Sequence, residues 1–246
     1  MMNQHCLRCG RQPTINAHIF PQSAVRAIRQ RGPDTKTLAV THDRAFTARF
    51  QNGFFDPAIL CKICDGKIGV ADKWFVENID TIHNLAERWE PFGVVATQLD
   101  PSLVIQFAVS VIYRASLSNL GQFSHISLGP YTGIASEIAV EANQSELSAA
   151  TVLINLLTSK KHDTKQFVFY PLKCSAGNGP YFIFTISGVQ FLVKFGGRLT
   201  AIGSSYDISS KLRIVLGKSV MLCCYPFSES AESKFLVGVK AKDNKS

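Results

Sequence analysis

Residues 60–67 read Leu-Cys-Lys-Ile-Cys-Asp-Gly-Lys, and residues 6–10 read Cys-Leu-Arg-Cys-Gly. Each stretch holds a Cys-x-x-Cys pair, a spacing at which one tight turn offers two thiolates to a single ion. Two such pairs supply the four ligands of a tetrahedral structural Zn²⁺ site, which we predict at Cys6, Cys9, Cys61 and Cys64. Disulfides or buried free thiols are the alternatives, but nothing else in the sequence indicates an oxidising compartment.

The chain has 246 residues, and 46% of them are apolar. This length exceeds one small domain and the composition is sufficient for a substantial core, so we expect two packed units. The first residues lack the pattern of a signal peptide, and no stretch reaches the roughly 18 consecutive apolar residues of a membrane helix. We therefore expect a cytoplasmic protein with reduced thiols and no membrane contact.

Positive charge is concentrated near the first cysteine pair. The formal net charge is +8, and residues 1–50 hold eight basic and two acidic residues, hence +6. Such an excess favours a polyanionic partner, with nucleic acid first. Basic character alone does not decide the matter, because many basic proteins bind no polyanion and four zinc-bound thiolates would cancel part of the charge.

Between the cysteine pairs, residues 15–20 alternate as a strand does, which points His18 away from the more apolar face. Pro21 then begins a helix over 22–31, and residues 34–55 have no clear period and are expected to form a loop. After the second pair, apolar residues recur at three- and four-residue steps and predict an amphipathic helix over 72–89, capped by Asp72. We place the boundary between a unit of residues 1–92 and a unit of residues 93–246 here.

Farther along, apolar stripes predict helices over 101–115 and over 145–157. Runs rich in branched and aromatic residues, separated by glycine-containing turns, predict strands over 167–170, 181–187, 189–195, 212–216, 220–225 and 235–239. Short connections imply antiparallel pairing. The predicted fold class is therefore α+β, with the helices of the second unit ahead of its sheet. Cys174, Cys223 and Cys224 lack the spacing of metal ligands, and we expect them to be thiols in the core.

The order of parts over residues 1–70 resembles a known family. A Cys-x-x-Cys pair precedes a strand that ends in His18-Ile19-Phe20-Pro21, and Leu60 to Cys64 then carries the second pair, followed by Lys67. This order resembles the zinc-containing branch of the HNH endonucleases, which have the ββα-metal or His-Me finger fold. The whole chain also resembles a group of uncharacterised bacterial HNH-like proteins, through the stretches Phe54-Phe55-Asp56-Pro57, Cys64-Asp65-Gly66 and Tyr113-Arg114-Ala115-Ser116.

The resemblance implies a catalytic site. His18 matches the general base, and a divalent cation such as Mg²⁺ or Mn²⁺ would stabilise charge on the scissile phosphate. Asp65 and Asp56 are the carboxylates nearest to the family's ligand positions. The family often has a ligand just before the base, where this chain has Ala17. The site is therefore either degenerate or completed by another side chain, the candidates being His42, Asp43 and Asp72.

Three basic residues are candidates for contacts with nucleic-acid phosphates: Arg26, Arg29 and Lys67. For the two arginines, the alternative is an ordinary charged helix face, and for the lysine a solvated turn. Arg114 follows an apolar helical stripe and could equally pair inside the protein.

From these features we expect a metal-dependent HNH-like endonuclease that cleaves double-stranded DNA, and the resemblance suggests a role in bacterial defence against foreign DNA. Residues 93–246 would then serve substrate positioning, oligomerisation as a homodimer, or regulation by a protein partner. The alternative is a non-catalytic, zinc-stabilised module that binds nucleic acid or protein through a degenerate HNH site. A structural protein whose C-terminal half binds a small molecule or a protein is the third interpretation.

Overall fold

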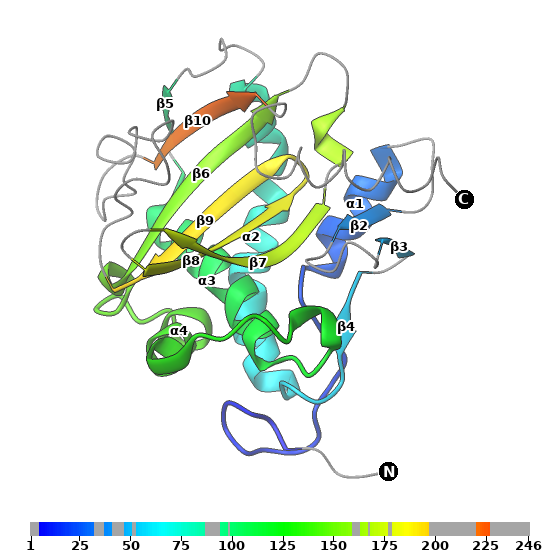
Figure 1. Ribbon diagram of the computed structural model, residues 1–246, viewed down its shortest axis with the longest axis vertical. Coiled ribbons are helices and arrows are strands. Elements are labelled where there is room, and N and C mark those ends of the chain that lie inside the picture. Colours follow the sequence, from blue (N-terminus) through cyan, green and yellow to red (C-terminus); the bar gives the residue numbers. More distant parts are fainter. Residues whose placement is uncertain are drawn as a thin grey trace.

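The computed structural model describes the chain over residues 5–31, 37–40, 47–50, 53–86, 94–97, 99–158, 163–166, 168–176, 179–196 and 220–226. Over these residues it is a mixed α+β protein in which helices pack against a sheet, and a four-cysteine group lies near the N-terminus (Figure 1). The predicted α+β class is therefore confirmed as a mixture of helices and mostly antiparallel strands.

The described strands form one large sheet and one small one. The large sheet has the order β3-β2-β7-β8-β9-β6-β10-β5. Its strands are β2 (Thr37–Val40), β3 (Thr47–Phe50), β5 (Val94–Thr97), β6 (Ala150–Thr158), β7 (Val168–Ala176), β8 (Gly179–Ile186), β9 (Val189–Phe195) and β10 (Val220–Pro226). Most neighbours are antiparallel as predicted, but β2 pairs with β7 and β10 pairs with β6 in parallel. Long connections between these partners permit parallel pairing.

The β8–β9 hairpin shows how local sequence sets the register. Ser187 and Gly188 form a two-residue turn, with φ of 52° and 73° respectively. Positive φ at both positions is the geometry that matches the twist of hairpin strands. A Cβ at Gly188 would lie 2.7 Å from the Thr164 carbonyl oxygen, so glycine is required there. Every residue of β9 is buried, so both faces of this strand lie inside the protein.

Four α-helices accompany the large sheet in the described part of the chain: α1 (Gln22–Arg31), α2 (Lys62–Ala86), α3 (Pro101–Leu117) and α4 (Thr132–Glu141). Helices α2 and α3 run behind β6 and β9 in Figure 1. Asp100 caps α3 by accepting a hydrogen bond from the Ser102 amide, and Pro101 occupies the first turn, where it leaves no donor unpaired. Helix α3 is buried on every side from Val104 to Ala115, which makes it the central helix.

One hydrophobic cluster extends from the cysteine pairs to β9. Phe75 of α2 stacks on Phe107 of α3 with ring centroids 4.2 Å apart, and Phe107 meets Phe191 of β9. Phe20, before α1, packs on Tyr170 of β7 at 4.6 Å. The division near residue 93 stays a prediction, but the sheet and the core include residues from both sides of it.

Two predicted segments differ from the structure. The helix over 145–157 is wrong, because residues 150–158 form β6, which pairs with β9 and β10. An apolar run of this length is compatible with both the helical and the strand period. Its branched residues favour a strand when other strands are available for pairing. The expected loop over 34–55 contains β2 and β3, and pairing with β7 stabilises these short strands.

Helix α2 begins about ten residues earlier than its apolar period suggested. The second cysteine pair therefore overlaps its first turn, and Asp72 lies inside the helix rather than at its cap. The inward positions Phe75, Ile79 and Ile82 are confirmed as buried. The strands predicted over 212–216 and 235–239 lie outside the described residues. Cys174 is only partly buried, so its prediction as a core thiol is wrong, while Cys223 and Cys224 lie in β10 as expected.

Candidate metal centre and histidine site

The four cysteines of the two Cys-x-x-Cys pairs lie together. In the first pair, the chain turns back so that the Gly10 amide donates to the Cys6 carbonyl at 2.8 Å, with Gly10 at a φ of 72°. That left-handed conformation suits glycine. The second pair starts α2, where the Asp65 amide donates to the Cys61 carbonyl at 3.0 Å. Both turns therefore present their sulfur atoms on one side.

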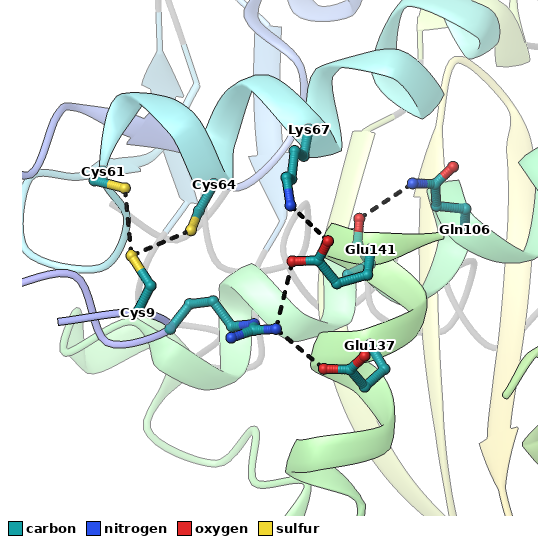
Figure 2. Close-up of polar contacts among 9 residues, drawn as sticks. Cys9, Cys61, Cys64, Lys67, Gln106, Glu137 and Glu141 are labelled. Carbon is teal, nitrogen blue, oxygen red and sulfur yellow. Dashed lines mark hydrogen bonds and ion pairs between the residues drawn. The ribbon is translucent and has the colours of Figure 1, made fainter. Parts of the chain in front are cut away.

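Backbone hydrogen bonds bring the two pairs together. The Leu7 amide donates to the Ile59 carbonyl at 3.0 Å, and the Ile15 amide donates to the Leu60 carbonyl at 2.9 Å. The four Sγ atoms lie within 4.8 Å of one another. Cys9 Sγ is 3.7 Å from Cys61 Sγ and 3.6 Å from Cys64 Sγ (Figure 2).

These distances test the predicted ligand set. A tetrahedral zinc ion with Zn–S bonds of about 2.3 Å separates its sulfur ligands by about 3.8 Å. A disulfide would require about 2.05 Å. The cysteines are free thiols in the structure, so the disulfide alternative is contradicted and the cluster could hold a structural zinc ion.

The electrostatics of the cluster favour a thiolate. Burial opposes ionisation of Cys61, but hydrogen bonds from the amides of Cys64 and Ile63 and from the Cys9 thiol bring its pKa to about 7. Burial, followed by hydrogen bonds with Cys9 and Cys61, raises the pKa of Cys64. At least one thiolate, the form that binds metal, is therefore accessible near neutral pH.

Ion pairs attach the cysteine cluster to helix α4. Arg8 lies 3.0 Å from Glu137 and 3.5 Å from Glu141, and Lys67 lies 2.5 Å from Glu141. Figure 2 shows Lys67 reaching Glu141 beside Cys64. The Lys67 hydrogen bond lowers the pKa of Glu141. Lys67, predicted as a phosphate contact, therefore has an intramolecular partner, and its contact with nucleic acid stays a prediction.

His18 lies on a small two-stranded sheet whose strands both come between the two cysteine pairs in the sequence. Strand β1 (Ala17–His18) pairs antiparallel with β4 (Phe55–Asp56), and His18 is opposite Phe55. Their rings are 5.7 Å apart, and the imidazole is half-buried. Burial, then the charge of Arg114, then that of Arg26 lower the pKa of His18. The imidazole is therefore neutral at cellular pH, the form that accepts a proton.

Asp56 faces away from His18. It is opposite Ala17 in the two-stranded sheet, and paired residues share a face whereas successive residues along a strand alternate. The carboxylate is 3% exposed and accepts hydrogen bonds from the Ala58 amide at 2.9 Å, the Ser118 hydroxyl at 2.8 Å and the Asn119 amide at 3.0 Å. The geometry therefore gives Asp56 a structural role and separates it from His18.

Asp65 and Asp72 lie on the same side of α2, because seven residues make about two helical turns. Asp72 accepts two hydrogen bonds from Arg114 of α3, at 2.7 and 2.9 Å. Burial raises the pKa of Asp65, and Arg114 opposes that rise. Arg114 is thus a common electrostatic neighbour of His18, Asp65 and Asp72. Sequence reasoning assigned Asp72 to a cap and left Arg114 open, although the spacing of the two carboxylates was a usable signal.

The other predicted site residues are dispersed. Within the described ranges, the four cysteines are the sole group of three or more side chains arranged to bind a metal, so His18, Asp65 and Asp56 do not form a second such group. Arg26 is exposed on α1 near His18, and Arg29 is partly buried on the same helix. His42 and Asp43 lie outside the described residues.

Comparison with protein-family models, curated proteins and solved structures finds no match for this chain. Among the described helices, none combines the length and apolar character needed to cross a membrane. The structure therefore defines a mixed α+β protein with a four-cysteine cluster that could bind zinc.

Proposed function

We propose that this protein is a metal-dependent, HNH-type endonuclease that cleaves double-stranded DNA, with His18 as the general base. The observation that carries the proposal is the environment of His18, which is half-buried beside two arginines and has a lowered pKa. The order of β1, β4 and α2, with a cysteine pair before β1 and another at the start of α2, is consistent with a ββα-metal unit.

The four cysteines would bind a structural Zn²⁺ ion. The ion would join the loop before β1 to the first turn of α2, and so hold the two-stranded sheet that carries His18 against the helix. Zinc in this role stabilises the fold and takes no part in the chemistry. Two sulfur separations, 3.7 and 3.6 Å from Cys9, are close to that of a tetrahedral site and support this part of the proposal.

In the reaction, the neutral His18 imidazole accepts a proton from water as the water oxygen attacks the phosphorus atom and the 3′ oxygen leaves. A bound Mg²⁺ or Mn²⁺ would stabilise the negative charge that develops on the phosphate and the leaving oxygen. Asp65 is the residue that fits this cation. Its carboxylate accepts no hydrogen bond from a described residue, whereas those of Asp56 and Asp72 do. Mg²⁺ commonly needs only one or two carboxylates in addition to water and substrate phosphate.

Helix α1 follows His18 directly and would meet the DNA backbone. Arg26 and Arg29 are one turn apart on this helix, so they can contact successive phosphates. The excess positive charge of residues 1–50 would add a non-specific, salt-dependent attraction. Cleavage of foreign DNA in a bacterial cytoplasm is the role that we propose.

The test is cleavage of supercoiled plasmid by the zinc-loaded protein with added Mn²⁺ or Mg²⁺. We expect cation-dependent nicking that is lost in His18→Ala and retained in His125→Ala, a matched control because His125 is a partly buried histidine outside both cysteine pairs and outside β1 and β4. Equal nicking by both variants would indicate a contaminant or another base. DNA binding without cleavage by any of the proteins would refute the enzyme.

A non-catalytic module that binds nucleic acid or protein is the second candidate. Three observations favour it: Ala17 replaces a ligand, Asp56 is fully engaged in structural hydrogen bonds, and Asp72 is paired with Arg114. This candidate predicts DNA affinity that falls steeply with salt and is equal in the wild type and His18→Ala. A DNA titration at two salt concentrations beside the plasmid assay separates the candidates.

A further inference from the structure

A cavity of about 280 Å³ lies where β8 begins and β9 ends, between these strands, β7 and the short turn η2 (Gly129–Tyr131). Buried apolar side chains line it, those of Leu128, Phe182 and Phe195. Exposed small residues, among them Pro130 and Pro180, form its rim. Small-molecule sites commonly measure about 300–1,000 Å³, so this cavity has the size of a small ligand site.

The sheet register places a lysine beside two aromatic rings. Lys173 of β7 is opposite Phe182 of β8, and Phe182 is opposite Val193 of β9. Phe195 follows Val193 by two residues and therefore lies on the same face of the sheet. The rings of Phe182 and Phe195 are 6.3 Å apart and meet edge to face. A cation and an aromatic surface are thus adjacent on one face, at the cavity.

Tyr131 of η2 forms an aromatic wall over the end of β9. Its ring stacks on that of Phe195, with centroids 5.7 Å apart and an angle of 20° between the planes. Gly196 has a φ of 64°, and a Cβ at this position would collide with the Tyr131 ring. Glycine is therefore required for Tyr131 to lie there. Aromatic rings favour offset-stacked or edge-to-face neighbours, and this lining offers such contacts to a flat ligand.

The charge of the lining is positive. Its charged residues are Lys173 and Lys194, and no acidic residue belongs to the described lining. Lys194 precedes Phe195 in β9, so its side chain lies on the other face of the sheet and Lys173 supplies the charge. The exposed Lys173 donates from Nζ to the Ser127 carbonyl at 3.2 Å. An ammonium group has three donors, so this hydrogen bond fixes Lys173 at the rim and leaves other donors for a ligand.

We propose that this cavity binds a small planar anion, a single flat ring that carries one carboxylate or phosphate group. The ring packs against Phe182, Phe195 and Tyr131, and the anionic group accepts hydrogen bonds from Lys173. The cysteine cluster and His18 take no part in the lining, so the inference is independent of the proposed nuclease activity. It gives a ligand site to the part of the chain after residue 93, which the HNH resemblance over residues 1–70 does not cover.

The experiment is an NMR titration of the ¹⁵N-labelled full-length protein with benzoate and with phenyl phosphate. Benzamide is the neutral ring and acetate the anion without a ring. We expect saturable shifts of the amides of Gly129, Gly179 and Gly196, which line the cavity. Benzamide and acetate should bind about tenfold more weakly than the better ring anion, because each lacks the ion contact or the ring contact. The ratio of benzoate to phenyl phosphate affinity distinguishes a carboxylate ligand from a phosphate ligand.

Variants of Lys173 test the charge. Lys173→Gln should weaken binding of the better ring anion about tenfold, and Lys173→Arg should restore most of it. Lys73→Gln is the matched control and should bind as the wild type does, because Lys73 is an exposed lysine of α2 outside the lining. Equal binding of both ring anions by folded Lys173→Gln and the wild type overturns the inference. So does benzamide that binds as tightly as the anions, or the absence of saturable shifts at the three glycines. None of these results depends on whether the protein cleaves DNA.

Discussion

If the four-cysteine cluster binds zinc as we propose, removal of the ion should unfold the region around the cysteine pairs. Structural zinc sites contribute about 10–16 kcal/mol of apparent binding free energy in zinc-finger peptides, against about 5–15 kcal/mol for the whole stability of a typical protein. Among the described residues, the loop and the segment after it also connect to the second pair through backbone hydrogen bonds to Ile59 and Leu60 and a bridge between Thr14 and Cys61, and Arg8 forms partly solvated ion pairs. Each of these contributes about 1 kcal/mol. A bound zinc ion would therefore contribute more to the stability of this region than these other contacts do.

The assay combines metal content with thermal melting. We expect about one zinc per chain in the wild type, a lower melting temperature after chelation, and a similar loss in Cys61→Ser. Replacement of zinc by Co²⁺ should give the absorption of a tetrahedral thiolate site. Cys174→Ser is the matched control, because Cys174 lies in β7 outside the cluster and is only partly buried.

Two results would refute this reasoning. One is zinc-free protein that melts at the same temperature as the zinc-loaded protein. The other is a Cys174→Ser variant that loses as much zinc and stability as Cys61→Ser, since that outcome would assign the metal to different cysteines.

Four further outcomes are expected. Tyr170→Phe should cost about 1–3 kcal/mol in urea unfolding, because the buried hydrogen bond that the Phe54 amide donates to the Tyr170 hydroxyl would be lost. Asp56→Ala should cost on the order of 3 kcal/mol, since three hydrogen bonds to a buried carboxylate are lost, and clearly more than Ser118→Ala. Lys67→Ala should cost about 1 kcal/mol or less, because its ion pair is exposed; a large loss of DNA affinity would indicate a phosphate contact instead. The folded-state pKa of His18 is lowered, so its contribution to stability is present above about pH 6.5 and is lost as the pH falls through that folded-state pKa. The free energy of unfolding, measured with urea at several pH values in this range, should no longer show this pH dependence in His18→Gln.

Local patterns predicted several elements correctly. The stripe over 101–115 corresponds to α3, the helix over 22–31 corresponds to α1, and the Ser187-Gly188 turn separates two strands as expected. These predictions are correct because a clear period or a turn residue determines the conformation of the residues next to it in the chain. The cysteine spacing likewise predicted the four-thiol cluster, which is confirmed.

Elements without a distinct period were decided by partners distant in the chain. Six of the nine residues 150–158 are apolar and do not mark a single face, and the pairing of β6 with β9 and β10 makes the segment a strand. Strands β2 and β3 are too short to be recognised locally and exist as part of the large sheet.

The sequence by itself determined which four cysteines come together, because two Cys-x-x-Cys pairs at this spacing are typical of one shared site. It also placed His18 on a strand next to a basic helix. Only the tertiary structure turned Asp56 away from His18 and brought Arg114 of α3 against Asp72 of α2. The register of β1 with β4 and the packing of α2 on α3 depend on contacts between residues far apart in the chain. A buried ion pair between two helices also produces no periodic pattern in the sequence of either one.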